Sequence, residues 1–247
     1  MKKIHKINFA LVVFVIFSVA FYGCGTVNLF DCDTGRAKSK CTKRTKDEDA
    51  RIALDNGDMT TAVKLLQELV DANPTEYKRY PLLSAAYAGK SGFDILSVVT
   101  ANFGGANSLV QTMTSFLPTP ITKGDLYEQS LVDMDSSVDT LNIIPAEYRE
   151  STSADKYATS AVLQLTLYQA AYGIMLLNKF TYSTTEYDAS KLSSMTAEDA
   201  AKILEALAGA AGAAGAGASA TAAIAAIQAQ PGATDQEKLA AWSQAAR

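Results

Sequence analysis

Hydrophobic positions between residues 50 and 74 follow the period of two amphipathic helices. The first helix carries Ala50, Ala53 and Leu54 on one face, since residues three and four apart lie on the same side of a helix. In the second helix the apolar positions are Ala62, Leu65, Leu66, Leu69 and Val70. Gly57-Asp58 separates the two, because glycine readily takes the left-handed conformation that ends a helix, and Asn73-Pro74 stops the second. The pattern predicts a helical hairpin.

Three further helices are predicted in the middle of the chain. One starts at Pro81, is broken by Gly89 and Gly92, and is followed by another helix from Phe93. Residues 161–178 are the most apolar segment after the first 23 residues, but glutamines and tyrosines interrupt this segment. We therefore predict a central buried helix there rather than a transmembrane span.

Alanine and glycine dominate the C-terminal part. Thr196 and Asp199 form a capping-box-like start, and the helix is predicted to continue into residues 206–227, which contain thirteen alanines and four glycines. Each glycine inside a helix costs about 1 kcal/mol relative to alanine. Either close packing on the other helices offsets this cost or the helix is loose, and we favour close packing. Residues 234–246 are predicted to form a short helix anchored by Trp242, which completes an all-α fold.

The first 23 residues have the organisation of an export signal. Three lysines precede an almost unbroken apolar run, Ile7–Phe21, and a small residue, Gly23, follows it. Basic residues before a short apolar run, with a small residue at its end, are typical of a cleavable signal peptide. The run is shorter than the roughly 20 apolar residues that cross a bilayer, so we predict a signal peptide over residues 1–23.

Gly23-Cys24 resembles the lipobox of bacterial lipoproteins, although Phe21 and Tyr22 stand where that family usually has leucine and a small residue. The resemblance implies that Cys24 is linked to diacylglycerol and becomes the first residue after cleavage. Gly25 is not the aspartate that retains such lipoproteins in the inner membrane of enteric bacteria. By this resemblance we expect the protein on the periplasmic face of the outer membrane, with an ordinary signal peptide or an uncleaved anchor as the alternative.

Residues 24–48 are predicted to form a polar tether between the lipid and a folded domain. The tether contains Cys32 and Cys41, and an even pair of cysteines in an exported protein favours a disulfide over two free thiols. Its basic residues are Arg36, Lys38, Lys40, Lys43, Arg44 and Lys46. Close to a lipid anchor such a run suits anionic headgroups, and a solvated linker is an equally good interpretation.

The hairpin over residues 50–74 resembles a tetratricopeptide repeat (TPR). The small, apolar and turn residues that carry the resemblance are Ala50, Ala53, Gly57, Ala62, Leu66, Leu69 and Pro74. The 34-residue period of that family leads from Ala53 to Tyr87, within the third predicted helix. The resemblance implies helical hairpins stacked into an α-solenoid or helical bundle. A generic bundle with the same turn residues is the alternative.

A short motif that occurs twice in the chain supports internal repetition. Pro74-Thr-Glu-Tyr77 recurs as Pro145-Ala-Glu-Tyr148, 71 residues later and close to two TPR periods. Each copy follows a Gly-Asp pair and precedes an Ala-Ala-Tyr sequence, with about fourteen extra residues in the second copy. We therefore predict three or four degenerate hairpins over residues 49–195, followed by the Ala/Gly-rich helix and tail over residues 196–247.

These resemblances imply binding functions. TPR arrays bind peptides or proteins on a concave surface, so we expect a non-catalytic scaffold that recruits a protein partner. The expected partner-binding residues are Tyr77, Arg79, Tyr80 and Tyr87, and burial of the tyrosines in the core is an equally open alternative. The Ala-Ala-Tyr helices also loosely resemble the periplasmic T component of TRAP-type transporters. That resemblance implies the alternative function, an accessory protein that binds a small apolar ligand or a solute-binding protein.

Composition argues against catalysis and nucleic-acid binding. The only histidine is His5, within the predicted signal peptide, so the mature chain has no histidine for a catalytic triad or a metal site. Loss of the signal peptide changes the formal net charge from −4 to −7, whereas nucleic-acid binding usually needs clustered basic residues. We expect no enzymatic activity, no cofactor and no metal.

Two polar motifs in the middle of the chain also lack the features of a site. Gly89-Lys90-Ser91 matches only the end of a phosphate-binding loop, and a helix rather than a strand precedes it. Asp133, Asp135 and Asp139 lie on a predicted helix at spacings that do not converge on one point, so we predict a solvated acidic face.

Overall fold

The computed structural model describes residues 44–94, 113–149, 156–211 and 217–245. The described part of the chain is helical and contains no β-strand beyond an isolated bridge between Tyr182 and Tyr187. This confirms the all-α class. The predicted signal peptide and the predictions for Cys24, Cys32 and Cys41 lie outside the described residues.

The first hairpin forms where the hydrophobic pattern predicts it. α2 (Lys46–Asp55) packs against α3 (Met59–Ala72). The apolar side chains that the two helices bury are Ala50, Ala53, Ala62, Leu66 and Val70. Gly57 makes the turn with a left-handed φ of 74°, a conformation that glycine adopts at little steric cost.

Side chains cap both helices of this hairpin. The Thr45 hydroxyl accepts a hydrogen bond from the Glu48 backbone N–H, and the Glu48 carboxylate accepts one from the Thr45 N–H at 2.8 Å. This capping box starts α2 ahead of residue 49, where we expected the helical domain to begin. Asp58 starts α3 by accepting from the Thr61 N–H at 3.1 Å.

The third helix, α4 (Tyr80–Ser91), differs from the prediction at Gly89. The helix runs through this residue, because glycine permits a close approach of α3: a β-carbon at Gly89 would lie 2.8 Å from the Met59 sulfur. The helix ends instead at Gly92, whose φ is 97°. The helix expected after Phe93 falls mostly outside the described residues.

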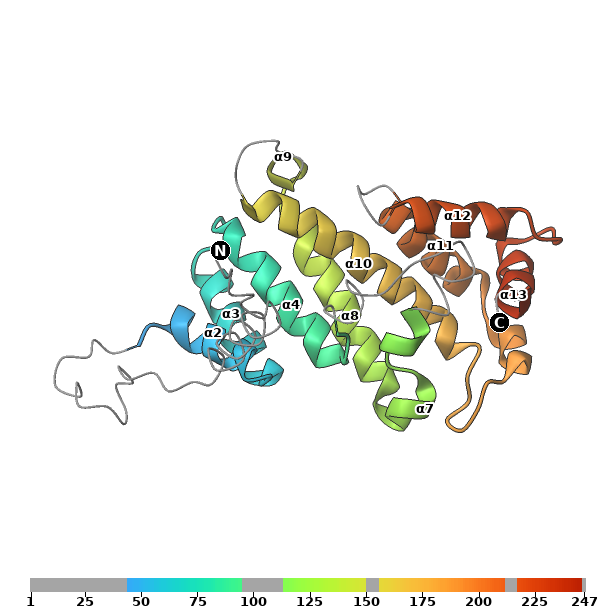
Figure 1. Cartoon of the computed structure of the whole chain (residues 1–247), viewed down its shortest axis with the longest axis horizontal. Coiled ribbons are helices and arrows are strands. Elements are labelled where there is room, and N and C mark those ends of the chain that lie inside the picture. The colour runs from blue at the N-terminus through green and yellow to red at the C-terminus, as the bar shows by residue number, and fades with distance from the viewer. Residues whose placement is uncertain (1–43, 95–112, 150–155, 212–216, 246–247) are drawn as a thin grey trace, which may run out of the picture. The chain divides into compact units, whose positions relative to one another are not determined.

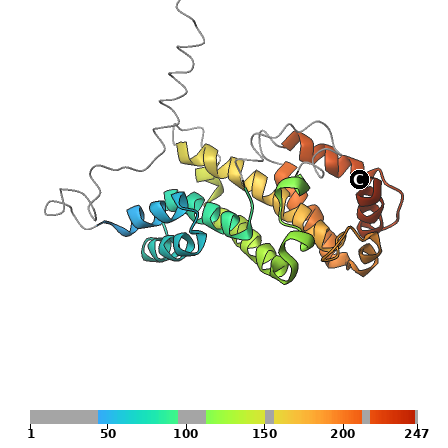
Figure 2. The ribbon, with the colours of Figure 1, turned by 60° about the horizontal axis from the view of Figure 1, so that its bottom comes forward.

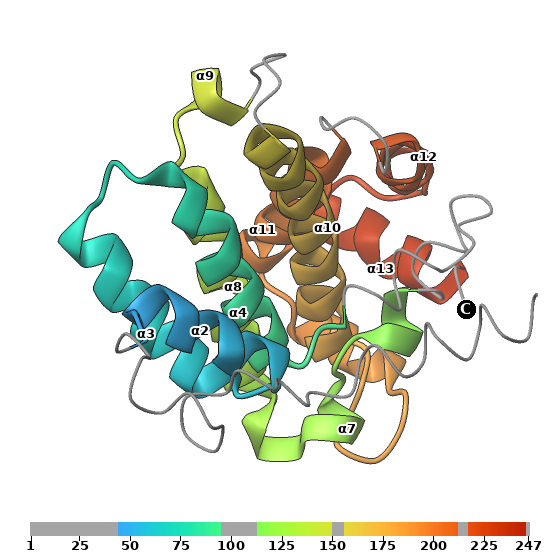
Figure 3. The ribbon, with the colours of Figure 1, turned by 60° about the vertical axis from the view of Figure 1, so that its left-hand side comes forward.

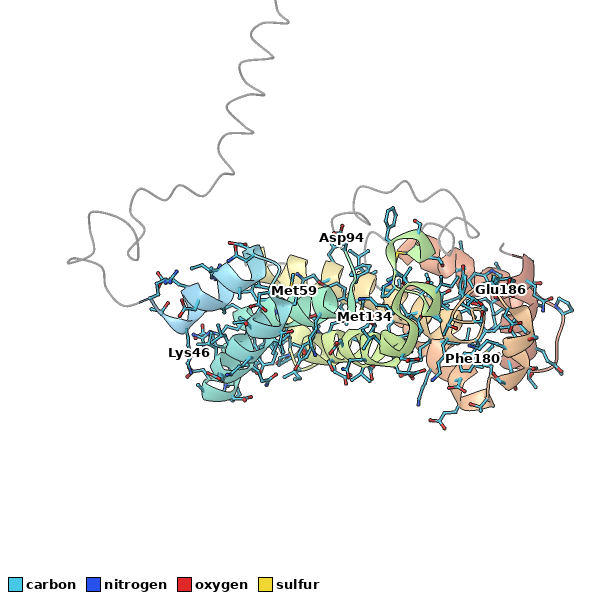
Figure 4. The ribbon with its side chains drawn as sticks, turned by 90° about the horizontal axis from the view of Figure 1, so that it is seen from below. Lys46, Met59, Asp94, Met134, Phe180 and Glu186 are labelled. Atoms are coloured by element: carbon cyan, nitrogen blue, oxygen red, sulfur yellow. The ribbon has the colours of Figure 1, made fainter. Side chains whose placement is uncertain are left out.

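α4 packs most extensively on α8 (Tyr127–Asn142), which follows the short helices α7 (Pro120–Lys123) and η2 (Gly124–Leu126). Polar links cross this interface. The Ser84 hydroxyl donates to the Ser137 carbonyl at 2.7 Å, and Lys90 Nζ donates to Asp133 Oδ1 at 2.8 Å. Met134 of α8, labelled in Figure 4, directly follows Asp133 in the sequence and is fully buried. The interface therefore combines apolar packing with hydrogen bonds that pair α4 and α8 in one register.

α10 (Lys156–Lys179) is the central helix. It packs against α4, α8, the short helix α9 (Ala146–Arg149) and α11 (Ala197–Ala211) (Figures 1 and 3). Its buried residues include Ala161, Thr166, Leu167, Tyr168, Ala171, Ile174, Met175 and Leu177. Across the described ranges, no helix has both the length and the apolar character of a membrane span. The buried helix predicted over residues 161–178 is confirmed.

The Ala/Gly-rich tract forms two helices where we expected one. α11 ends at Ala211 and α12 (Gly217–Gln228) packs back against it. The reason lies in composition, since glycines lower helix propensity throughout this tract. The expected close packing occurs at Gly209, where a β-carbon would lie 2.5 Å from the Gln169 side chain of α10.

The last described helix, α13 (Asp235–Ala245), matches the prediction. Trp242 is 1% exposed and anchors α13 in a core cluster that extends from Ala50. Helices that follow one another along the chain pack side by side, from α2 at one end to α13 at the other, as the colour order in Figures 1 and 2 shows. Stacked hairpins would give this order, and the additional contact of α4 with α10 is a feature of bundles.

Candidate protein-interaction surface

The two Pro-x-Glu-Tyr segments meet in the structure. Tyr77 begins the 3-10 helix η1 (Tyr77–Arg79), and Tyr148 lies in α9. Their ring centroids are 4.9 Å apart and the ring planes are inclined at 48°, within the roughly 4.5–7 Å at which aromatic pairs attract. Segments 71 residues apart in the sequence therefore supply one aromatic pair.

Tyr80 stands next to this pair as a core residue. Its side chain is 2% exposed, and its ring centroid lies 6.0 Å from that of Tyr77. The Tyr80 hydroxyl donates to the Pro74 carbonyl oxygen at 2.8 Å, and burial raises the pKa of Tyr80. The sequence left open whether the tyrosines bind a partner or are buried in the core. Tyr80 is buried, and its ring packs against Tyr77 from the core side.

Arg79 fixes the segment that carries Tyr77. Its Nη1 donates to the Leu69 carbonyl oxygen at 3.1 Å, in the last turn of α3, where a cation is favoured by the helix dipole. Its Nε lies 3.7 Å from Asp47 Oδ1 of α2, and the Arg79 side chain is 16% exposed. Arg79 therefore ties η1 to both helices of the first hairpin and offers little surface to a partner.

Arg149 has a related position in the second segment. It follows Tyr148 directly, and its Nη1 donates to Asn142 Oδ1 at the end of α8, at 3.1 Å. In both segments an arginine close after the tyrosine reaches back to the end of the preceding long helix. The aromatic pair is thus held from both sides by hydrogen bonds to neighbouring helices.

The accessible part of this surface combines tyrosine with charges of both signs. Tyr148 is 55% exposed and Tyr77 is half-buried. Lys78 Nζ lies 2.6 Å from Glu76 Oε1, and this hydrogen bond lowers the pKa of Glu76. We name this surface the tyrosine edge and define it as Glu76, Tyr77, Lys78, Tyr148 and Arg149.

Tyr87 is separate from the tyrosine edge. It lies on α4, seven residues after Tyr80, and packs partly buried against the core. At about 1.5 Å per helical residue, its backbone is about 10 Å from that of Tyr80 along the helix axis. The four residues predicted to bind a partner thus separate into the half-buried Tyr77, the positioning residue Arg79 and the packed Tyr80 and Tyr87.

The sequence prediction missed Tyr148 as a surface residue. The signal was present, because Tyr148 is the last residue of the repeated Pro-x-Glu-Tyr motif. A contact between the two copies could have been proposed from the repeat alone. Which copy stays exposed depends on packing, since α4 buries residues directly after the first copy whereas α9 is a single short turn with no buried residue.

The three aspartates of α8 do not share one solvated face. Asp133 is 4% exposed and is paired with Lys90, which corrects the prediction for this residue. Asp139 is exposed, and Asp135 is intermediate. The prediction missed the pairing because Lys90 belongs to a helix 43 residues earlier.

Burial raises the pKa of Asp135, and the nearby carboxylate of Asp139 adds to the effect, whereas a hydrogen bond with Tyr172 opposes it. Because the folded-state pKa is raised, the contribution of Asp135 to stability is fully present below the unfolded pKa near 3.8 and is lost as the pH rises through the folded value. We therefore expect Asp135→Asn to be more stable than wild type at neutral pH, by less than about 1 kcal/mol because the site is partly solvated.

Urea unfolding followed by circular dichroism at several pH values measures this effect. The advantage of Asp135→Asn should shrink as the pH falls toward 3.8. Asp125→Asn is the matched control, because Asp125 is exposed at the start of the same region. A stability difference that stays constant with pH would contradict the assignment to Asp135.

Neither the geometry nor the comparisons point to bound metal or to a known family. In the described ranges, no group of three or more histidine, cysteine, aspartate or glutamate side chains is placed to hold a metal ion. No protein-family model, no curated protein sequence and no solved structure matches this chain. The tyrosine edge is therefore interpreted from its own chemistry.

Proposed function

We propose that this protein is a non-catalytic scaffold, anchored by lipid on Cys24 at the periplasmic face of the outer membrane, whose TPR-like helical domain binds a protein partner. The tyrosine edge is the proposed contact surface. The observation that carries the proposal is the pairing of Tyr77 with the 55% exposed Tyr148. Tyrosine and arginine are enriched among the residues that dominate binding energy at protein interfaces.

The hydrogen bonds that hold the tyrosine edge in place favour binding of a partner. Tyr80 and Arg79 hold the Tyr77 segment through the Pro74 and Leu69 carbonyl groups. A surface that is already ordered before binding loses less conformational entropy when a partner docks. Tyrosine adds a large apolar ring and a hydroxyl that can hydrogen-bond, so the edge offers both contact area and polar specificity.

The charge distribution supports a domain that stands free of the lipid surface. Residues 45–247 contain 24 acidic and 14 basic residues, whereas residues 24–44, the part that would remain ahead of the domain after cleavage, contain five basic and two acidic residues. An anionic lipid surface attracts basic segments and repels acidic ones over about a Debye length. The helical domain would therefore remain available to a protein partner while the N-terminal part lies at the membrane.

We expect Tyr148→Ala to weaken partner binding about tenfold or more, the usual effect of removing a tyrosine at the centre of an interface. A photo-crosslinking amino acid placed at position 147 in intact cells should trap one dominant partner, and Tyr148→Ala should reduce that adduct. Mass spectrometry identifies the trapped protein. Tyr187→Ala is the matched control, because Tyr187 is also an exposed tyrosine but lies in another segment.

Crosslinking from position 132 provides the comparison surface, since Val132 is 57% exposed on α8. Equal adducts from positions 132 and 147, or adducts that Tyr148→Ala leaves unchanged, would contradict partner binding at the tyrosine edge. Cys24→Ala tests the anchor in the same cells, because labelled palmitate should be incorporated into the wild type and not into this variant.

A further inference from the structure

A second surface, chemically unlike the tyrosine edge, lies near the C-terminus. The 3-10 helix η3 (Ala189–Ser194) and α13 line an open groove of about 530 Å³. Its polar lining residues are Ser190, Ser193, Thr234, Gln236, Glu237 and Gln244. Ligand sites typically have volumes of roughly 300–1,000 Å³, so the groove is large enough for a small molecule.

The walls of the groove are fixed to each other and to the core. Gln236 Nε2 of α13 donates to the Met195 carbonyl oxygen just after η3. On the opposite side of α13, the side chains of Leu239 and Trp242 are almost completely buried in the core. The lining side chains are therefore presented by two elements whose relative position is set by packing and a hydrogen bond.

The hydroxyl hydrogens on the η3 side of the groove are already committed. The Ser190 hydroxyl donates to Asp188 Oδ1 at 2.6 Å, and the Ser193 hydroxyl donates to the Ser190 carbonyl oxygen at 2.7 Å. A hydroxyl that donates its one hydrogen keeps two lone pairs as acceptors. The η3 side therefore presents oxygen acceptors, and a ligand on it has to supply hydrogen-bond donors.

The α13 side adds amide groups and one carboxylate. Gln236 uses its amide nitrogen on Met195 and keeps its amide oxygen, whereas Gln244 makes no hydrogen bond within the described ranges. Glu237 Oε2 accepts from the Ala233 and Thr234 N–H groups at 2.7 and 3.1 Å, so its charge is engaged at the start of α13. Among the described residues that line the groove there is no lysine or arginine, so these residues offer no cationic side chain to a phosphate or another anion.

We propose that this groove binds a short, neutral saccharide. Sugar hydroxyls are compact donors that match the oxygen acceptors of Ser190, Ser193 and Gln236, and each also accepts from an amide such as that of Gln244. Ala240, which is half-buried, provides apolar contact for the C–H groups of a sugar ring, whereas Leu192 is 4% exposed and offers little surface. The proposal rests on the groove alone and stands independently of the tyrosine edge.

Titration of the full-length protein with neutral glucose, mannose and N-acetylglucosamine oligosaccharides tests this proposal. A detergent without a sugar headgroup is required, because a glycosidic detergent would compete. We expect saturable shifts of side-chain amide NMR signals at concentrations up to roughly 10 mM, near the weak end of specific small-ligand binding. Gln244→Leu should weaken binding about tenfold, the loss expected for one or two neutral hydrogen bonds.

Gln244→Leu is suitable because Gln244 is exposed and no hydrogen bond among the described residues depends on it. The matched control is Gln228→Leu on α12, an exposed glutamine outside the groove. Absence of saturable shifts with every oligosaccharide would overturn the proposal, as would equal binding by Gln244→Leu and wild type. Binding limited to amino sugars with a free ammonium group would also overturn it, since it would indicate recognition of a cation by Glu237.

Discussion

Trp242→Ala is expected to lower the free energy of unfolding by about 3–5 kcal/mol, the usual cost of removing a large aromatic side chain from a core. Trp242 is 1% exposed and anchors α13 beside the fully buried Leu239. Few other described residues of α13 are buried, so the truncation removes most of the apolar contact that holds this helix. Urea unfolding followed by far-UV circular dichroism is the appropriate measurement, because Trp242 is the only tryptophan and the variant has no indole fluorescence.

Trp242→Phe separates ring packing from hydrogen bonding. The Trp242 indole nitrogen is buried and makes no hydrogen bond in the part of the chain that the structure describes. Phenylalanine keeps an aromatic ring and removes this unpaired donor, so we expect a cost below about 1.5 kcal/mol. If Trp242→Ala unfolded at the same urea concentration as wild type, the docking of α13 on the core would be contradicted.

Local features of this fold were predictable because they depend on neighbouring residues. The turn at Gly57 required a left-handed conformation, and the apolar period over residues 62–70 identified the buried face of α3. Trp242 was recognisable as an anchor because it is the single large aromatic residue of its helix. Each of these inferences uses a spacing of a few residues, for which helix geometry is known in advance.

Features that depend on contacts between distant helices were missed. Gly89 was expected to end α4, but the approach of Met59 from α3 gives this glycine a packing role inside the helix. Asp133 was expected in solvent, although α4 covers it and supplies Lys90. Spacing within α8 contains no information about which helix packs on it, so neither error could be avoided from periodicity.

The candidate sites were also predictable only as far as they depend on local sequence. The repeated motif identified Tyr77 and contained Tyr148, but only the fold shows that the two rings touch. The groove between η3 and α13 was not anticipated, because serine, threonine and glutamine at irregular spacing are also common in ordinary loops. Its acceptor-rich character becomes visible only when the partners of Ser190 and Gln236 are known.

Lys90→Met is expected to lower the free energy of unfolding by about 2–3 kcal/mol. Breaking a fully buried ion pair by removing one partner costs about 3–5 kcal/mol, and the cost is smaller here because the Lys90 side chain is 33% exposed. The Asp133 side chain is only 6% exposed, so the variant leaves its carboxylate in the α4–α8 interface with Gln129 as a neutral donor at 3.3 Å. Urea unfolding at constant pH measures the loss.

Adding Asp133→Asn to Lys90→Met should recover at least half of that loss, because an amide of the same shape removes the uncompensated charge and can still accept from Gln129. The coupling energy from the wild type, both single variants and the double variant isolates the Lys90–Asp133 interaction from changes in packing. Lys202→Met serves as control, since its pair with Glu198 is exposed and should contribute nothing measurable. Strictly additive effects of the two substitutions would show that the pair does not stabilise the α4–α8 interface. A large coupling energy would instead identify Lys90–Asp133 as an interaction that helps to select α8 as the partner of α4.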